Sequence, residues 1–166
     1  LMYFIDYKLG DVDGDGRQDL VWLQSGQETG GPERIFVHLS RANAAGEHKF
    51  EQASGSVNLA GQFDNDRGWF LLDYDADGRD DLVLTEVTLP SGGSSVQWRL
   101  HRSTGTGFSA TSEVLTDAVG QPLLARDDAE AVVADTNGDG LPDLLATAPN
   151  GALALRELLR NPVRTP

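Results

Sequence analysis

Three acidic segments at a constant spacing constrain the fold of this chain more than any other feature. They read DVDGDGRQDL, DYDADGRDDL and DTNGDGLPDL, and they begin at Asp11, Asp73 and Asp135. Successive starts are 62 residues apart (11 to 73, then 73 to 135). A motif that returns at a fixed period indicates an array of similar supersecondary units. The sequence therefore predicts three such units.

The repeat extends beyond the acidic segments, because short apolar runs precede and follow each of them. Examples are WFLLD before the second segment, and DLVWL, DLVLTEV and DLLATA, each of which starts with the last aspartate of its segment. Runs of this length, rich in Leu and Val and bounded by turn residues, are typical of β-strands. The 62-residue period also pairs further positions: Gly30 with Gly92, Gly31 with Gly93 and Phe36 with Trp98.

Alternating apolar residues predict a third strand in each of the first two units. These residues are Ile35, Val37 and Leu39 in the first unit, and Val96, Trp98 and Leu100 in the second. A fourth strand is predicted to begin near Phe50 and near Phe108. Four short antiparallel strands within about sixty residues form a blade of a β-propeller.

The chain is therefore predicted to be an all-β, partial propeller within a single domain (residues 1–166). Its blade units are expected at approximately residues 7–62, 69–124 and 131–166. The third unit is shorter, and its last apolar segment, ALALRELLR, fits either a strand or a short helix. Because propellers typically have four to eight blades, three units do not close a ring. We expect further blades from the same longer chain, in preference to a ring assembled from several copies.

Each acidic segment places oxygen ligands at alternate positions of a tight loop. Counting from the first aspartate, side-chain oxygens fall at positions 1, 3, 5 and 9, and a glycine at position 6 permits a sharp turn. The main-chain carbonyl at position 7 is expected to add another oxygen. The predicted ligands are Asp11, Asp13, Asp15, Arg17 and Asp19; Asp73, Asp75, Asp77, Arg79 and Asp81; and Asp135, Asn137, Asp139, Leu141 and Asp143.

Calcium fits this ligand set better than other cations, and up to three ions are predicted. Magnesium seldom uses a protein cage of this size, and zinc or copper would favour nitrogen or sulfur. An EF-hand is excluded, since position 12 is Trp22, Leu84 or Ala146 and the flanks are strand-like. Acidic turns without a metal are the alternative. Three copies in register argue against it, because each loop would crowd several like charges together.

The overall charge supports a cation as partner. The chain has 26 acidic and 13 basic residues, a formal net charge of -13, and three dications would change this to -7 (-13 + 6). Nucleic-acid binding is disfavoured, because it requires a basic face. No apolar run is long enough to span a membrane, and cysteine is absent.

In the order strand, acidic loop, strand, the stretches KLGDVDGDGRQDLVW, FLLDYDADGRDDLVL and VVADTNGDGLPDLLA resemble FG-GAP (also called VCBS) repeats. This is the repeat family of integrin-like propellers and of many bacterial surface and secreted proteins. The resemblance covers about Tyr7 to Ala148. It implies a propeller with a calcium loop between the first two strands of each blade, and ligand roles for the twelve side chains at positions 1, 3, 5 and 9. The phenylalanyl-glycyl and glycyl-alanyl-prolyl signatures of the family are absent or eroded here.

The remaining residues carry no sign of catalysis, so the chain is predicted not to be an enzyme. His38 and His101 are expected on the strand faces opposite the apolar residues, facing solvent or a neighbouring blade. Trp22, Trp69 and Trp98 suit packing between blades, with a sugar-stacking platform as the alternative.

Because millimolar calcium is found outside cells, an extracellular or cell-surface location is expected. We expect a module that binds a protein or glycan ligand within an adhesin, receptor or toxin. The alternative is a non-catalytic accessory segment of a secreted carbohydrate-active enzyme.

Overall fold

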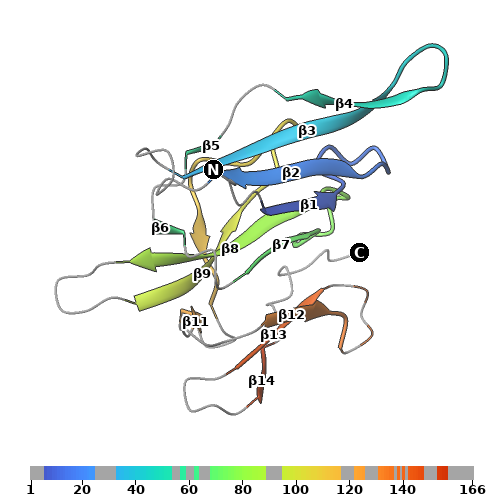
Figure 1. Cartoon of the computed structure of the whole chain (residues 1–166). Helices are drawn as coiled ribbons and strands as arrows, with labels where there is room; N and C mark the ends of the chain where they lie inside the picture. The colour runs from blue at the N-terminus through green and yellow to red at the C-terminus, as the bar shows by residue number, and fades with distance from the viewer. Residues whose placement is uncertain are drawn as a thin grey trace.

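The computed structural model describes residues 6–24, 33–53, 57–58, 62–63, 68–88, 95–116, 122–125, 131–136, 138, 140, 142–147 and 153–156. These residues form strands, turns and bends, with no helix among them. The strands make three antiparallel sheets, which follow one another along the chain (Figure 1). The all-β prediction is confirmed.

The first sheet is a meander, as predicted. Its hydrogen-bonded order is β1-β2-β3-β4, and β5 also pairs with β3. The strands are β1 (Asp6–Gly10), β2 (Asp19–Gln24), β3 (Arg34–Ala42), β4 (His48–Gln52) and β5 (Val57–Asn58). Strand β4 includes Phe50, near which the fourth strand was expected.

The second sheet has the order β10-β9-β8-β6, with β7 paired to β8 and β11 paired to β9. Phe108, where a fourth strand was expected to start, forms only an isolated bridge with Ser103. The fourth strand begins five residues later, at Glu113. The strands are β6 (Gln62–Phe63), β7 (Trp69–Leu72), β8 (Asp81–Thr88), β9 (Ser95–His101), β10 (Glu113–Val114) and β11 (Leu124–Ala125).

The third sheet is β12-β13-β14, from β12 (Ala131–Ala134), β13 (Asp143–Thr147) and β14 (Leu153–Arg156). Strand β14 resolves the ambiguity of the last apolar segment in favour of a strand, as far as that segment is described. The Asn150-Gly151 pair before it, a sequence typical of a hairpin turn, lies outside the described residues.

The register of the third strands corrects one prediction. Leu20 pairs with His38 in the first sheet, whereas Leu82 pairs with His101 in the second. Equivalent third-strand positions are therefore 63 residues apart (38 to 101), because the connection in the second unit is one residue longer. Phe36 thus corresponds to Arg99, and the predicted match of Phe36 with Trp98 is wrong. A slip of one residue exchanges the two faces of a strand.

The sheets pack face to face through two hydrophobic cores, and the second sheet contributes to both. Alternation along β8 divides its side chains, because neighbouring residues point to opposite faces. Leu82 and Leu84 belong to the core shared with the first sheet, and Val83 belongs to the core shared with the third. Val21 of the first sheet and Leu144 of the third face the second sheet in these cores. This is the stacking expected of consecutive blades.

Candidate metal centre

The three acidic segments are the connections between the first two long strands of each unit. Loop 1 (residues 11–18) joins β1 to β2, loop 2 (73–80) joins β7 to β8, and loop 3 (135–142) joins β12 to β13. The position-9 aspartate is the first residue of the following strand in all three units. The antiparallel pairs on either side therefore hold the two ends of each loop together.

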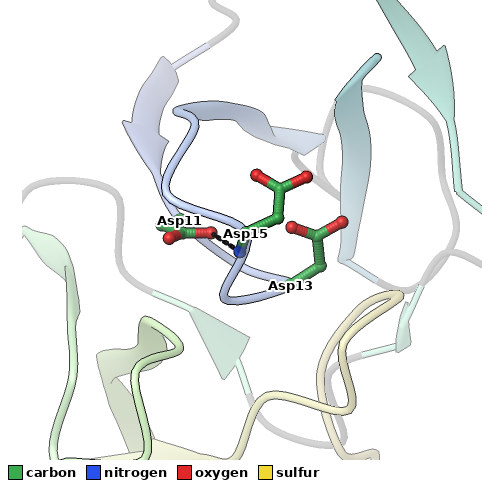
Figure 2. Close-up of side chains that lie close together, drawn as sticks. All are labelled: Asp11, Asp13 and Asp15. Carbon is green, nitrogen blue, oxygen red and sulfur yellow. Dashed lines mark hydrogen bonds between the residues drawn. The ribbon is translucent and has the colours of Figure 1, made fainter. Parts of the chain in front are cut away.

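Loop 1 brings three predicted ligands together. Carboxylate oxygens of Asp11, Asp13 and Asp15 all lie within 4.8 Å of one another, and Figure 2 shows the three side chains on one turn of chain. Asp11 organises this turn: its Oδ1 accepts the amides of Gly14 (2.8 Å) and Asp15 (3.1 Å), and its Oδ2 accepts the amide of Gly16 (2.7 Å). The backbone thus wraps around the position-1 carboxylate.

Loop 2 repeats the arrangement. The carboxylates of Asp73, Asp75 and Asp77 meet the same 4.8 Å limit. Asp73 Oδ1 accepts the amide of Asp77 (3.0 Å), and Asp73 Oδ2 accepts that of Gly78 (2.9 Å). One difference is at position 4, where Ala76 has φ of 57°. Glycine occupies this position in the other two loops.

Loop 3 is described in part. Asp135 accepts the amides of Gly138 (2.7 Å) and Gly140 (2.9 Å), as the position-1 aspartates of the other loops do. Its other predicted ligands at positions 3, 5 and 7, Asn137, Asp139 and Leu141, lie outside the described residues.

The position-9 aspartates are buried and hold the loop to the rest of its sheet. Asp19 Oδ2 accepts the Val12 amide (2.9 Å), and Asp19 Oδ1 accepts the Ser40 amide (2.7 Å). Asp81 accepts the Ser103 amide (2.7 Å), and Asp143 accepts the Thr136 amide (2.9 Å). None of the three is in the triplets described above, so the structure shows a structural role for them. Their role as closing ligands stays a prediction.

Arginines offset the charge of the triplets. In loop 1, Arg41 Nη1 lies 2.6 Å from Asp13 Oδ2 and 3.3 Å from Asp15 Oδ2. Asp15 also pairs with Arg17. Sequence reasoning gave Arg17 a role through its carbonyl and missed Arg41, which belongs to β3 and is 26 residues from Asp15.

Loop 2 has its own pair of guanidinium groups. Arg102 Nη1 lies 2.5 Å from Asp75 Oδ2, and Arg79 pairs with Asp77. Arg102 was also missed, because no local pattern relates it to a residue 27 positions away.

Burial changes the acidity of several carboxyl groups beside the loops. Desolvation raises the pKa of Asp81 to about 6, although the hydrogen bond from Ser103 opposes the shift. Burial also raises the pKa values of Asp19 and Asp80. A nearby cation would favour the charged form of each group.

The donor set fits a hard cation. The triplets offer only oxygen atoms, and Asp13 Oδ1 is buried without a hydrogen-bond partner. Gly16, Gly78 and Gly140, at position 6, have φ of 84°, 89° and 83°, in the left-handed region that glycine adopts at little cost. Calcium takes six to eight oxygen ligands from such loops.

Two stretches of the chain, residues 11–84 and 73–146, match the FG-GAP-like repeat. The chain belongs to the FG-GAP-like repeat family. Both matches begin at position 1 of an acidic loop, which confirms the resemblance and the 62-residue period. The sheets are therefore propeller-type blades of this family. No curated protein and no solved structure shows significant similarity to the chain.

One histidine and two tryptophans of this FG-GAP-like chain are buried: His101, Trp69 and Trp98. His101 is buried, with Nε2 3.1 Å from Glu86 Oε1 and Nδ1 2.8 Å from the Ser109 carbonyl. Trp69 and Trp98 are buried in separate cores. The three tryptophans therefore do not form a shared platform. The part of the chain that the structure describes contains no helix long and apolar enough to cross a membrane.

Proposed function

We propose that this chain is a calcium-stabilised part of a β-propeller that serves as a non-catalytic interaction module of a larger extracellular or cell-surface protein. The observation that carries the proposal is the pair of matching carboxylate triplets in loops 1 and 2. Their family often binds calcium, is generally non-catalytic and is typical of extracellular or surface proteins. An adhesin, a receptor and a toxin component are the classes of host protein that fit.

Calcium would be structural in this chain. In loop 1 the ion would be held by Asp11, Asp13 and Asp15, with the Arg17 carbonyl and Asp19 as further candidates. The equivalent residues would serve loops 2 and 3. The ion would supply positive charge that the arginines now provide in part. At an extracellular-type affinity of about 0.1–1 mM and tenfold excess calcium, each site would add roughly 1–1.5 kcal/mol to folding stability.

The outer face of the first sheet supports further blades as partners. Tyr7 is 65% exposed and Leu9 is 53% exposed, although both are apolar strand residues. By register, Tyr7 corresponds to Trp69, since they pair with the equivalent residues Trp22 and Leu84. Trp69 is buried against the first sheet. The corresponding face of the first sheet thus has the composition of a surface between blades. We propose that a preceding blade of the same longer chain covers it.

Thermal unfolding followed by circular dichroism tests the calcium proposal. With all three sites filled, the gain of roughly 3–4 kcal/mol corresponds to a rise in melting temperature of about 10 °C for a chain of this size. Magnesium at the same concentration should give a smaller rise. Replacing Asp13 and Asp15 by Asn should remove about a third of the calcium effect. An unchanged midpoint in millimolar calcium would contradict a structural role.

A glycan-binding accessory segment of a secreted carbohydrate-active enzyme is the second candidate. Its support is the part-exposed Trp22 on the outer face of the first sheet. However, Trp22 stacks on Phe36, with ring centroids 4.1 Å apart and planes at 9°, so one ring face is already covered. A glycan array separates the candidates, because specific sugar binding lost in Trp22→Ala would favour the second.

A further inference from the structure

Loops 1 and 2 belong to neighbouring sheets and are joined by two hydrogen bonds. The Asp80 amide donates to the Asp11 carbonyl oxygen (2.7 Å), and the Asp11 amide donates to Asp80 Oδ2 (2.8 Å). Asp11 is position 1 of loop 1, and Asp80 is position 8 of loop 2. A side chain and an amide of one acidic loop therefore hold the main chain at the first ligand of the other.

A second connection runs through Ser103, which follows β9. Its hydroxyl donates to the Val12 carbonyl oxygen in loop 1 (2.6 Å), while its amide donates to Asp81 Oδ1 (2.7 Å). The backbones are also close, because a Cβ atom on Gly14 would lie only 3.2 Å from the Gly78 carbonyl oxygen. Loop 1 thus lies directly on loop 2.

The contacts between the loops are made at the main chain of Asp11, a predicted calcium ligand. The Asp11 carboxylate accepts three amides of its own loop, so the main-chain orientation at Asp11 determines where the carboxylate and those amides lie. Asp80 stands between Arg79 and Asp81, the predicted ligands at positions 7 and 9 of loop 2. A change in loop 2 on cation binding would therefore move the Asp80 amide and the Asp80 carboxylate, the two groups that hold the Asp11 backbone.

The contact is specific to one pair of loops. Position 8 is Gln18 in loop 1, Asp80 in loop 2 and Pro142 in loop 3. Proline has no N–H to donate and no carboxylate to accept. Loop 3 therefore cannot hold loop 2 as loop 2 holds loop 1.

We propose that Asp80 is a positioning residue that couples loops 1 and 2, so that a cation in one loop raises the affinity of the other. The inference rests on the proposed calcium binding. Thermodynamic coupling is reciprocal and commonly amounts to 5- to 150-fold. We expect about tenfold for two direct hydrogen bonds at a ligand residue.

The test is a calcium titration of the whole chain followed by NMR, with the Gly16 amide reporting on loop 1 and the Gly78 amide on loop 2. Loop 2 is disabled by Asp75→Asn together with Asp77→Asn. This change should lower the calcium affinity of loop 1 about tenfold when Asp80 is present. In an Asp80→Ala background the loss should shrink to about threefold, because the side-chain acceptor is removed while the backbone amide at position 80 still donates to the Asp11 carbonyl oxygen. Asp80→Asn keeps an acceptor oxygen and should retain the coupling.

Two controls are matched to this design. Gln18→Ala changes the same position in loop 1 and should leave the coupling intact. Asp135→Asn, in loop 3, should leave loop 1 affinity unchanged. Hydrogen exchange without calcium gives an independent readout: the Asp11 amide should exchange faster in Asp80→Ala, while the Val21 amide in β2 stays protected and shows that the sheet is folded.

The outcomes separate the coupling from the calcium proposal. Two results would overturn the coupling while leaving calcium binding intact. One is that disabling loop 2 lowers the calcium affinity of loop 1 by the same tenfold in the Asp80→Ala background. The other is that disabling loop 2 does not lower that affinity when Asp80 is present. No response of either glycine amide at about 10 mM calcium, well above extracellular-type dissociation constants, overturns calcium binding and the coupling with it.

Discussion

At the scale of single residues, the aspartates at positions 8 and 9 whose pKa values burial raises make the folding stability depend on pH. The Asp81 carboxyl has a pKa of about 6 in the folded chain against an ordinary value of 3.8, and the pKa values of Asp19 and Asp80 are raised in the same direction. Between about pH 4 and pH 6, the folded state therefore binds more protons at Asp81 than the unfolded state does. Stability conferred by the neutral form is lost as pH rises through this window.

We therefore expect the calcium-free chain to melt at a higher temperature at pH 5 than at pH 7. Asp77 does not cancel this effect, because Arg79 lowers its pKa and its contribution changes only below about pH 4. Calcium should reverse the order, since it favours ionised carboxylates. Asp81→Asn should reduce the calcium-free difference between the two pH values. Melting curves that keep the full difference in this variant would assign the effect to other groups.

Position 4 of the loops gives a second prediction for a single residue. Ala76 has φ of 57°, a left-handed conformation that costs an L-residue roughly 1–2 kcal/mol. Glycine avoids this cost but loses more entropy on folding. Ala76→Gly should therefore stabilise the chain by about 0.5–1 kcal/mol in urea unfolding.

The reverse change in loop 1 is the matched control. Gly14→Ala should destabilise by more than Ala76→Gly gains, because the new Cβ would also lie 2.9 Å from Arg79 Cγ. If the two substitutions changed the unfolding free energy by equal and opposite amounts, the contact between the loops would contribute nothing to the cost of Gly14→Ala.

At the scale of elements, the spacing of residues within a short segment predicted the contacts inside that segment. Ligands within one loop share a tight turn, so the triplets at Asp11 and Asp73 could be read from spacing alone. Contacts between distant segments could not. Asp80 is 69 residues from Asp11, and Ser103 is 91 residues from Val12.

The third-strand register was missed for a related reason. The additional residue lies in the connection before β9, so the alternation of apolar residues along β9 itself does not reveal it. Residues of β3 and β9 matched at 62 residues would point to opposite faces of their sheets. The shift appears when the pairing of Leu82 with His101 is compared with that of Leu20 with His38.

The close approach of β1 to the second sheet gives a prediction at this scale. A Cβ on Gly10 would lie 2.8 Å from both Asp80 Oδ2 and Leu71 Cδ1. Gly10→Ala should therefore cost about 1–3 kcal/mol by overpacking and displace the Asp80 carboxylate. Urea unfolding should show a smaller penalty when Asp80→Ala is added. Gly46→Ala, where the new Cβ has open space at a φ of 80°, is instead a control for Gly14→Ala, because it measures the left-handed strain alone. A Gly10→Ala penalty unchanged by Asp80→Ala would remove Asp80 from this explanation.

At the scale of the whole molecule, the sheets stack in chain order, with the second sheet between the first and the third. In the second sheet, one face packs on the unit before it and the other packs on the unit after it, as the division of Leu82 and Val83 between two cores shows. The first sheet follows the same rule on the side facing the second sheet. Its opposite face carries Tyr7, Leu20, Trp22 and Phe36, and this is the face on which we propose that a preceding blade packs.

Equivalent aromatic residues on these two faces should respond differently to truncation. Trp69→Ala should cost about 3–5 kcal/mol, because Trp69 is buried between sheets. Tyr7→Ala should change the stability of this chain by less than about 0.5 kcal/mol, since its side chain is mostly exposed. It should also reduce binding of a hydrophobic dye. If a preceding blade is then supplied in a longer chain, the cost of Tyr7→Ala should rise towards that of Trp69→Ala, because the same packing would form around it. A Tyr7→Ala cost that stays small in the longer chain would show that no blade packs on this face.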